Sequence, residues 1–395
     1  MRRRLLYTPE GVRDIYNMEC ARKRILQENL HNLLKMYGYH AIETPTFEFF
    51  DIFSQEIGTT PSKDLYKFFD REGNTLALRP DMTPSIARCV AKYYGDEEFP
   101  VRLCYMGNTF INNSSYQGRL KENTQLGAEL VGDNSVAADA EILALAVHAL
   151  KTAGLQEFQL GVGHVDFFRG LVQAAELPEE TKDSLVELIS NKNFFGVEEL
   201  IDSLHLPENL KELFSMLGSL CMTEDMLQRA KELAQGFPVI LQALNRLQAL
   251  MDVLACYGVE KYITIEPGML SSYHYYTGMI FAGYTFGSGE PIVKGGRYDQ
   301  LMDYFGKHAP AIGFAVVIDQ LLAALSRQKI EILTDNDQVL IVYAKAKQKE
   351  AIEHAIALRQ QGTGAVLAAW EDGKEEHDYR SYAERMQMQE VIFIS

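Results

Sequence analysis

The chain has 395 residues, of which 47% are hydrophobic and 23% are charged, a composition typical of a globular protein with about two or three domains. Its 38 Lys and Arg residues against 54 Asp and Glu residues give a net charge of −16, which disfavours binding to the phosphates of nucleic acids. The N-terminus lacks the apolar run of a secretory signal, no stretch approaches the roughly 18 uninterrupted apolar residues of a membrane span, and the cysteines are widely scattered. We therefore expect a cytoplasmic protein with no membrane segment.

The first predicted element is an amphipathic helix over residues 18–37, whose apolar side chains follow a helical period and stop before Gly38. A short strand over residues 39–44 follows and ends at Pro45. Amphipathic helices occur on many protein cores. Taken alone, this helix therefore indicates a packed core and no particular fold.

The next part of the chain alternates between strand and helix patterns. The expected elements are a β-hairpin over residues 65–79, a helix over 84–94, strands over 101–110 and 124–131, a helix over 139–153 and a strand over 159–164. The segment 111–123 between the two long strands is polar and is expected to be a loop. Because side chains alternate along a strand, Gln125 and Glu129 are predicted to share one face.

The second half of the chain begins with a helical segment and ends with a small α/β unit. Residues 168–256 read as helices, followed by strands over 262–266 and 279–286 and a strand-to-helix run over 311–325. The expected elements of the C-terminal unit are strands over 339–343, 365–370 and 391–394 and helices over 347–361 and 378–388. This alternation of strands and helices favours a parallel sheet.

Several separated motifs occur in a fixed order along the chain. They are Leu-Arg-Pro-Asp-Met-Thr at residues 78–83, Gln-Leu-Gly-Ala-Glu at 125–129, Tyr-Tyr at 275–276, Gly-Gly-Arg-Tyr-Asp at 295–299 and Gly-Phe-Ala at 313–315. With these motifs the chain resembles the class II aminoacyl-tRNA synthetases, most closely histidyl-tRNA synthetase. More narrowly, it resembles the catalytically silent paralogues that act as regulatory subunits of ATP phosphoribosyltransferase.

This resemblance implies an α+β fold with a class II synthetase-like antiparallel sheet flanked by helices. It places the core at residues 1–325, a helical insertion at about 168–256, and a truncated α/β domain similar to an anticodon-binding domain at 336–395. The helix over 18–37, the strand after it and Pro45 then correspond to the element through which class II cores form dimers.

The resemblance also assigns residues that would bind histidine. Asp81, Thr83 and Gln125 fall where synthetases bind the α-amino group, and Glu129 and Tyr276 fall where they read the imidazole, with Tyr275 beside them. Asp81 replaces the usual glutamate and is one methylene shorter. Without this context, Glu129 would be interpreted as a strand carboxylate that pairs with an arginine or faces solvent.

The arginines that bind ATP and the substrate carboxylate in the synthetases are absent from the matching positions. The sequence has Ile111, Ser271 and Gln320 there. The ligand carboxylate would then need Arg119, a backbone N–H group or a residue of a partner chain. Because each preorganised donor at developing charge contributes on the order of 10²–10³ in rate, we expect no aminoacylation.

We therefore predict a non-catalytic regulatory subunit without a cofactor or a metal. It would assemble with a short-form ATP phosphoribosyltransferase catalytic subunit for the first step of histidine biosynthesis, form a dimer through its class II core, and respond to histidine as effector, with tRNA binding disfavoured. Histidine would bind either in the synthetase-like pocket or at a subunit interface. The alternatives are a divergent histidyl-tRNA synthetase and a synthetase-like regulator that binds tRNA or another protein. His164 and His274 are predicted to be structural.

Overall fold

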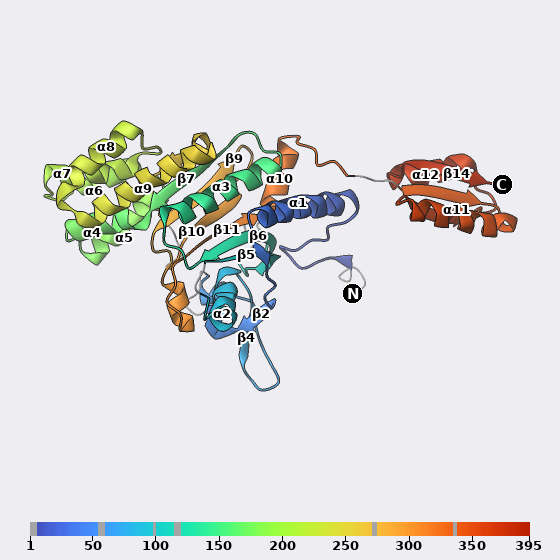
Figure 1. Cartoon of the computed structure of the whole chain (residues 1–395), viewed down its shortest axis with the longest axis horizontal. Coiled ribbons are helices and arrows are strands. Elements are labelled where there is room, and N and C mark those ends of the chain that lie inside the picture. Colours follow the sequence, from blue (N-terminus) through green and yellow to red (C-terminus); the bar gives the residue numbers. More distant parts are fainter. Residues whose placement is uncertain (1–5, 54–59, 98–99, 114–119, 271–274, 335–337) are drawn as a thin grey trace. The chain divides into compact units, whose positions relative to one another are not determined.

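The computed structural model describes residues 6–53, 60–97, 100–113, 120–270, 275–334 and 338–395. The chain divides into two compact units, Met1–Glu331 and Ile332–Ser395 (Figure 1). The larger unit holds a mixed sheet with helices packed on it, and the smaller unit is a three-stranded sheet with two helices.

An eight-stranded sheet forms the centre of the larger unit. In spatial order its strands are β1 (His40–Ala41), β5 (Val101–Phe110), β6 (Glu122–Val131), β11 (Ala311–Val317), β10 (Val293–Arg297), β9 (Met279–Thr285), β7 (Phe158–His164) and β8 (Ile263–Ile265). The six strands from β5 to β7 pair antiparallel, and the short edge strands β1 and β8 pair parallel to their neighbours. This is the antiparallel, helix-flanked sheet that the resemblance predicted.

Helices α1 (Asn17–Met36), α3 (Val136–Thr152) and α10 (Ile318–Arg327) pack against the central strands β6 and β11 (Figure 1). α3 is rich in alanine and leucine and mostly buried, which suits a helix enclosed between the sheet and other helices. Gly38 ends α1 with a φ of 82°, a conformation that glycine adopts without strain. The helix α2 (Thr83–Tyr93) packs against the 3₁₀ segment Leu301–Phe305.

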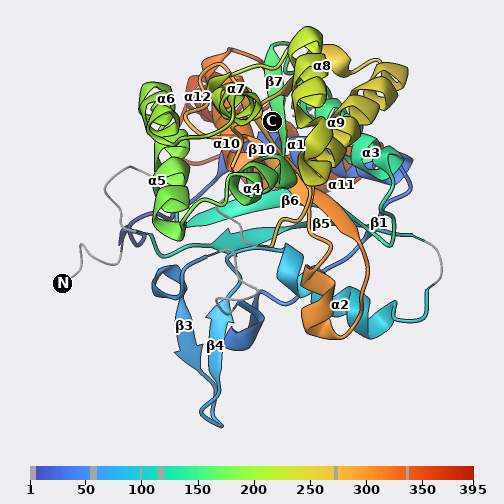
Figure 2. The same ribbon diagram turned by 90° about the vertical axis from the view of Figure 1, so that its left-hand side faces the viewer.

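A second, three-stranded antiparallel sheet has the order β2 (Phe47–Phe49), β4 (Thr75–Leu78) and β3 (Lys67–Phe69). Its β3–β4 hairpin turns at Gly73, whose φ is 88°. Figure 2 shows the hairpin projecting away from the large sheet. The side chains of Phe47, Phe49 and Phe69 are all at least half exposed.

The helical insertion consists of α4 (Val165–Ala174), α5 (Glu179–Ser190), α6 (Phe194–Ser203), α7 (Glu208–Ser215), α8 (Glu224–Leu233) and α9 (Pro238–Tyr257). By length and composition α9 resembles a membrane-spanning helix, and it is the one such helix among the described residues. It packs against α3, α4 and α8, and its Arg246 forms an ion pair with Asp139 of α3. These contacts are those of a core helix.

The smaller unit has a parallel sheet of order β13 (Gly364–Ala369), β12 (Gln338–Tyr343) and β14 (Glu390–Ile394). Helix α11 (Gln348–Gln360) covers the face that presents Val339 and Ile341, and α12 (Glu376–Arg385) covers the face that presents Leu340 and Val342. The parallel pairing predicted from the alternation of elements is confirmed.

The main differences from the predicted elements are local. β2 and β10 were not predicted, the strand over 39–44 is reduced to β1, and α3 begins three residues earlier than expected. Ser135 explains the earlier start, because its Oγ accepts a hydrogen bond from the Ala138 N–H at 3.1 Å and caps the helix.

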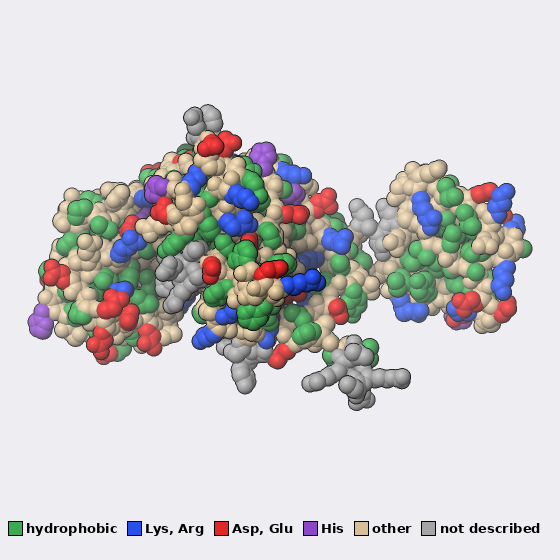
Figure 3. Space-filling view, turned by 90° about the horizontal axis from the view of Figure 1, so that it is seen from below, with side chains coloured by type: hydrophobic (Ala, Val, Ile, Leu, Met, Phe, Trp, Pro, Cys, Tyr) green, Lys and Arg blue, Asp and Glu red, His purple; other side chains and the backbone are tan. Residues whose placement is uncertain are grey.

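Acidic and basic side chains are interspersed with apolar ones on the face that Figure 3 shows, while the whole sequence has a net charge of −16.

Candidate functional site

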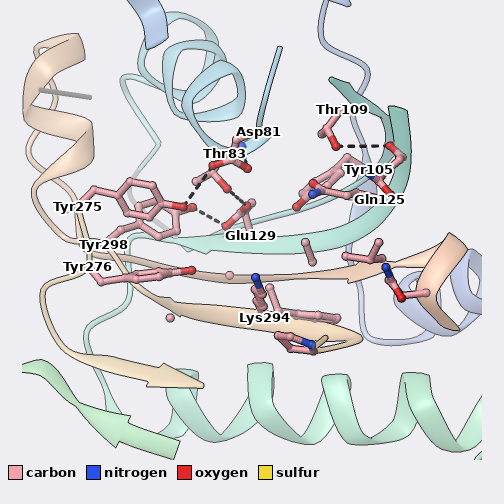
Figure 4. A pocket seen from close by; sticks show the side chains of 18 of the residues that line it. Asp81, Thr83, Tyr105, Thr109, Gln125, Glu129, Tyr275, Tyr276, Lys294 and Tyr298 are labelled. Atoms are coloured by element: carbon pink, nitrogen blue, oxygen red, sulfur yellow. Dashed lines mark hydrogen bonds between the residues drawn. The ribbon is translucent and has the colours of Figure 1, made fainter. Parts of the chain in front are cut away.

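A cavity of about 160 Å³ lies on the face of the large sheet that α1, α3 and α10 do not cover. Its walls come from β5, β6, β10 and β11, from the start of α2 and from the Tyr275–Tyr276 pair (Figure 4). Six residues predicted to bind histidine lie together in its lining: Asp81, Thr83, Gln125, Glu129, Tyr275 and Tyr276. The structure thus brings together residues that are almost 200 positions apart in the sequence.

Glu129 is the most buried charged group of the cavity. Its side chain is on β6, and the residue is 1% exposed. One carboxylate oxygen accepts a hydrogen bond from Thr83 Oγ1 at 2.9 Å, and the other accepts one from the Tyr298 hydroxyl at 2.6 Å (Figure 4). Burial raises the pKa of Glu129 to about 8, although both hydroxyl groups favour the ionised form. No arginine contacts it among the described residues, so the interpretation as an ion-paired strand carboxylate is wrong.

Glycines make room for Glu129 and for the aromatic wall. A Cβ on Gly313, the β11 partner of Glu129, would lie 1.6 Å from the Glu129 Oε2 atom. A Cβ on Gly296 would lie 2.7 Å from the Tyr276 ring. Both distances are far below van der Waals contact, so the glycines of the two motifs are needed for packing at the cavity floor.

Three tyrosines enclose the end of the cavity next to Glu129. The ring centroids of Tyr275 and Tyr276 are 4.8 Å apart, and those of Tyr275 and Tyr298 are 5.9 Å apart, both in edge-to-face geometry. The Tyr275 hydroxyl donates a hydrogen bond to Asp81 Oδ2 at 3.3 Å. These tyrosines could pack against a flat ligand ring whose N–H groups donate to the Glu129 carboxylate.

Asp81 and Gln125 are acceptors on the same cavity. Asp81 Oδ1 accepts the backbone N–H of Met82 at 2.7 Å, so part of this short carboxylate is used directly before α2 begins. The Gln125 Oε1 atom is buried and has no hydrogen-bond partner in the described part of the chain. Because a buried carbonyl oxygen without a partner is unfavourable, this atom calls for a donor such as an ammonium group. We call these residues, with Thr83, Glu129 and the tyrosines, the acceptor end.

The positions matched to ATP-binding arginines form the other part of the cavity, which we call the nucleotide end. Ile111 and Gln320 both line it, and neither carries a charge. The third position, Ser271, and the predicted anion contact Arg119 lie outside the described residues, as does His274. The described lining contains three carboxylates (Asp81, Glu129 and Glu290) and one cationic side chain, Lys294.

Two arginines in the surviving motifs have structural partners. Arg79 is buried and donates to the carbonyl oxygens of Asn108 at 2.8 Å and Thr44 at 2.7 Å. Arg297 is 1% exposed and pairs with Asp139 of α3, with Nη2 and Oδ1 2.5 Å apart. Both arginines hold strands and helices together.

His164 is buried and accepts the backbone N–H of Asp166 at 3.2 Å through Nδ1, which caps α4. Burial lowers its pKa to about 4. The structural role predicted for this histidine is confirmed. Among the described residues, no group of three or more His, Cys, Asp or Glu side chains is arranged to hold a metal ion.

Tyr298 and Lys294 are among the cavity residues that were missed from the sequence. Lys294 and Gly296 are on the side of β10 that faces the cavity, and Tyr298, directly after β10, continues the strand period of two. The signal was present in the spacing of residues 294, 296 and 298. It was obscured by Gly295 and Gly296, because glycine is depleted in strands.

Comparison with known proteins gives one consistent family. Residues 11–321 match the family model described as histidyl-tRNA synthetase. The ATP phosphoribosyltransferase regulatory subunit of Acetivibrio thermocellus is 40% identical over 360 residues, which is 90% of this chain and 85% of that protein. The protein of the same name from Thermoanaerobacter pseudethanolicus is 37% identical over 98% of this chain and all of its own length.

Solved structures agree with this assignment. A Bacillus halodurans protein described as an ATP phosphoribosyltransferase regulatory subunit/histidyl-tRNA synthetase aligns with a TM-score of 0.87 at 34% identity, over 99% of this chain and 98% of that one. Histidyl-tRNA synthetase from Nostoc aligns with a TM-score of 0.80 at 19% identity, over 97% of this chain and 90% of that one, which shows the shared fold. The chain belongs to the ATP phosphoribosyltransferase regulatory subunit family, a family built on the fold of histidyl-tRNA synthetase.

Proposed function

We propose that this chain assembles with a short-form ATP phosphoribosyltransferase catalytic chain, supports the first step of histidine biosynthesis, and transmits feedback inhibition by histidine. One observation carries the proposal beyond family membership: a single cavity keeps a buried carboxylate and an acceptor without a partner at one end, and has uncharged Ile111 and Gln320 at the other. That combination favours recognition of an amino acid over its activation with ATP.

Histidine has donors that suit the acceptor end. Its ammonium group would donate to Gln125 Oε1 and to Asp81, and an imidazole N–H would donate to Glu129, with the ring against Tyr275 and Tyr276. Hydrogen bonds to charged groups contribute about 1.5–3 kcal/mol each. Histidine would favour one geometry of the assembly over another, with a coupling free energy of about 1–3 kcal/mol, as is typical of allosteric proteins.

The chain would also dimerise through its class II core. In support, Phe47, Phe49 and Phe69 of the small antiparallel sheet are 50%, 56% and 73% exposed, and Phe47 packs edge-on against Phe68. Clusters of exposed aromatic side chains mark interaction surfaces. We expect the double variant F47S/F69S to sediment as a monomer at concentrations where the wild type is a dimer. A monomeric wild type would refute this part of the proposal.

We further propose that the chain does not bind tRNA and that its assembly is cytoplasmic. A net charge of −16 opposes binding to a polyanion. All five cysteines are free thiols, which suits a reducing compartment.

The test is reconstitution with the short catalytic chain. The two chains are co-expressed, isolated by size exclusion and assayed for phosphoribosyl transfer with and without histidine. We expect the catalytic chain to gain activity from this chain and to lose it when histidine is added. Full activity of the catalytic chain alone, with no response to histidine in the mixture, would refute the proposal.

A matched pair of variants locates the histidine site in that assay. Glu129→Gln should weaken inhibition while the complex still forms, whereas Glu198→Gln on the exposed surface of α6 should leave inhibition unchanged. Unchanged inhibition in both variants would place the histidine site at a subunit interface instead.

A further inference from the structure

A free amino acid carries a carboxylate as well as the donors that the acceptor end can receive. In the cavity that carboxylate favours a cationic or N–H donor, because a charge that is partly removed from water is stabilised by a charge-assisted hydrogen bond. The positions matched to synthetase arginines provide none at Ile111 and Gln320. Lys294 is the cationic side chain in the described lining of the cavity.

The strand register places Lys294 beside the acceptor end. Across β10 and β11 Lys294 pairs with Ala315, and Ala315 pairs with Gly127 on β6, midway between Gln125 and Glu129. Two strand spacings separate Lys294 from β6, which is about 10 Å. A lysine side chain reaches about 6 Å from its Cα. Lys294 can therefore reach a group that is bound over β11, between β10 and the side chains of Gln125 and Glu129 on β6.

The residues around Lys294 have small side chains or none, which leaves space above the sheet. Its neighbours on the same face of the sheet are Ala315, Gly296 and Gly313. Figure 4 shows Lys294 within the ring of cavity side chains, across from Gln125 and Glu129. Lys294 is exposed, so its long side chain can adjust to a ligand.

The charges of the cavity favour a zwitterion over a triphosphate. Three carboxylates and one ammonium group give the described lining a formal charge of −2, or −1 when Glu129 is protonated. A triphosphate would bring several further negative charges against this lining. A zwitterionic amino acid brings a single carboxylate, which Lys294 can bind, and an ammonium group, which the acceptor end can bind.

We infer that Lys294 binds the α-carboxylate of the amino acid in this cavity. It would replace the missing arginines in binding the carboxylate, but not in binding ATP. The inference rests on the proposed function, since it concerns the same ligand. Lys294 would select ligands that have a carboxylate next to the amino group. The alternative is that Lys294 is a surface lysine with no role in binding the ligand.

The test compares two ligands on three forms of the full chain. Histidine and histidinol, which has a hydroxymethyl group in place of the carboxylate, are titrated calorimetrically into the wild type, Lys294→Gln and Lys294→Arg at pH 8. We expect Lys294→Gln to weaken histidine binding about tenfold, at the low end for a charge-assisted hydrogen bond because the site is open to solvent. Binding of histidinol should stay within about twofold of the wild type. Lys294→Arg should retain most of the affinity for histidine.

The outcomes separate this inference from the proposed function. Equal affinity of the wild type and Lys294→Gln for histidine would overturn the role of Lys294 and leave the proposed function standing. Equal losses for histidine and histidinol would also overturn it, because the effect would then not depend on the carboxylate. A wild type that binds neither ligand would refute the histidine site itself. Thermal unfolding of the variants controls for folding, and a change of midpoint is not expected for an exposed lysine.

Discussion

At the acceptor end of the cavity, Glu129 is buried between the hydroxyl groups of Thr83 and Tyr298, and glycines keep the space around it clear. At the nucleotide end, uncharged Ile111 and Gln320 occupy the positions matched to arginines. On the function proposed above, one fold keeps the acceptors that bind an amino acid and lacks the donors that would activate it. Recognition needs acceptors and shape, whereas adenylation also needs donors aimed at developing phosphate charge.

The largest expected effect concerns the burial of Glu129. Its pKa is near 4.5 in the unfolded chain and about 8 in the folded protein, so between these values the folded state holds a proton that the unfolded state has lost. Stability contributed by the protonated group is complete below pH 4.5 and is lost as the pH rises to 8. Glu129→Gln removes this dependence. Relative to the wild type, the variant should therefore gain on the order of 4 kcal/mol of unfolding free energy between pH 4.5 and pH 9.

Urea unfolding of both proteins at pH 5 and pH 9 measures this difference, since other groups titrate equally in the two chains. Parallel stability profiles would mean that Glu129 is ionised in the folded protein throughout this range.

The second effect is the loss of ligand binding when the acceptor is neutral. Glu129→Gln should weaken histidine binding about 100-fold, because a hydrogen bond to a buried charge contributes up to about 3 kcal/mol. Calorimetric titration at pH 8 measures it. A decrease in histidine affinity of less than about threefold would show that Glu129 does not bind the imidazole.

The third effect tests whether the small residues of the floor are required. Gly313→Ala places a methyl group 1.6 Å from a Glu129 oxygen in the present geometry, so Glu129 must move. Overpacking of this kind costs about 1–3 kcal/mol, and histidine binding should fall with it. Gly236→Ala is the matched control, because nothing lies within 4 Å of its added Cβ. Equal midpoints of thermal unfolding for the two variants would contradict the close packing at the floor.

The smallest effect addresses the nucleotide end. The double variant I111R/Q320R restores cations where the synthetases have them, and we expect its affinity for ATP to rise about tenfold over the wild type. ATP binding is measured by titration at two salt concentrations, and I111Q is the uncharged control. An equal gain in I111Q would show that charge is not what the nucleotide end lacks.

The family resemblance assigned six acceptor-end residues that the cavity brings together. The strand period of two predicted that Gln125 and Glu129 share one face, the spacing of apolar residues predicted α1, and the turn at Gly73 predicted the β3–β4 hairpin. β10 was not predictable by pattern, because its two glycines carry no strand propensity. With that strand missed, Tyr298 and Lys294 were missed too.

The use of the remaining arginines was also beyond sequence reasoning. Arg79 and Arg297 find their partners on segments that are distant in the chain, at Thr44 and Asp139. Only the tertiary fold, which brings Thr44 to Arg79 and Asp139 of α3 to Arg297, decides that these side chains serve the scaffold. Composition and residue spacing do not predict such pairs.

Histidine-dependent exchange of pyrophosphate into ATP is measured alongside histidine titration on the same purified chain. We expect histidine to bind and exchange to stay at background at every concentration of ATP. Exchange that requires histidine and scales with the amount of this chain would show that the cavity still activates its ligand.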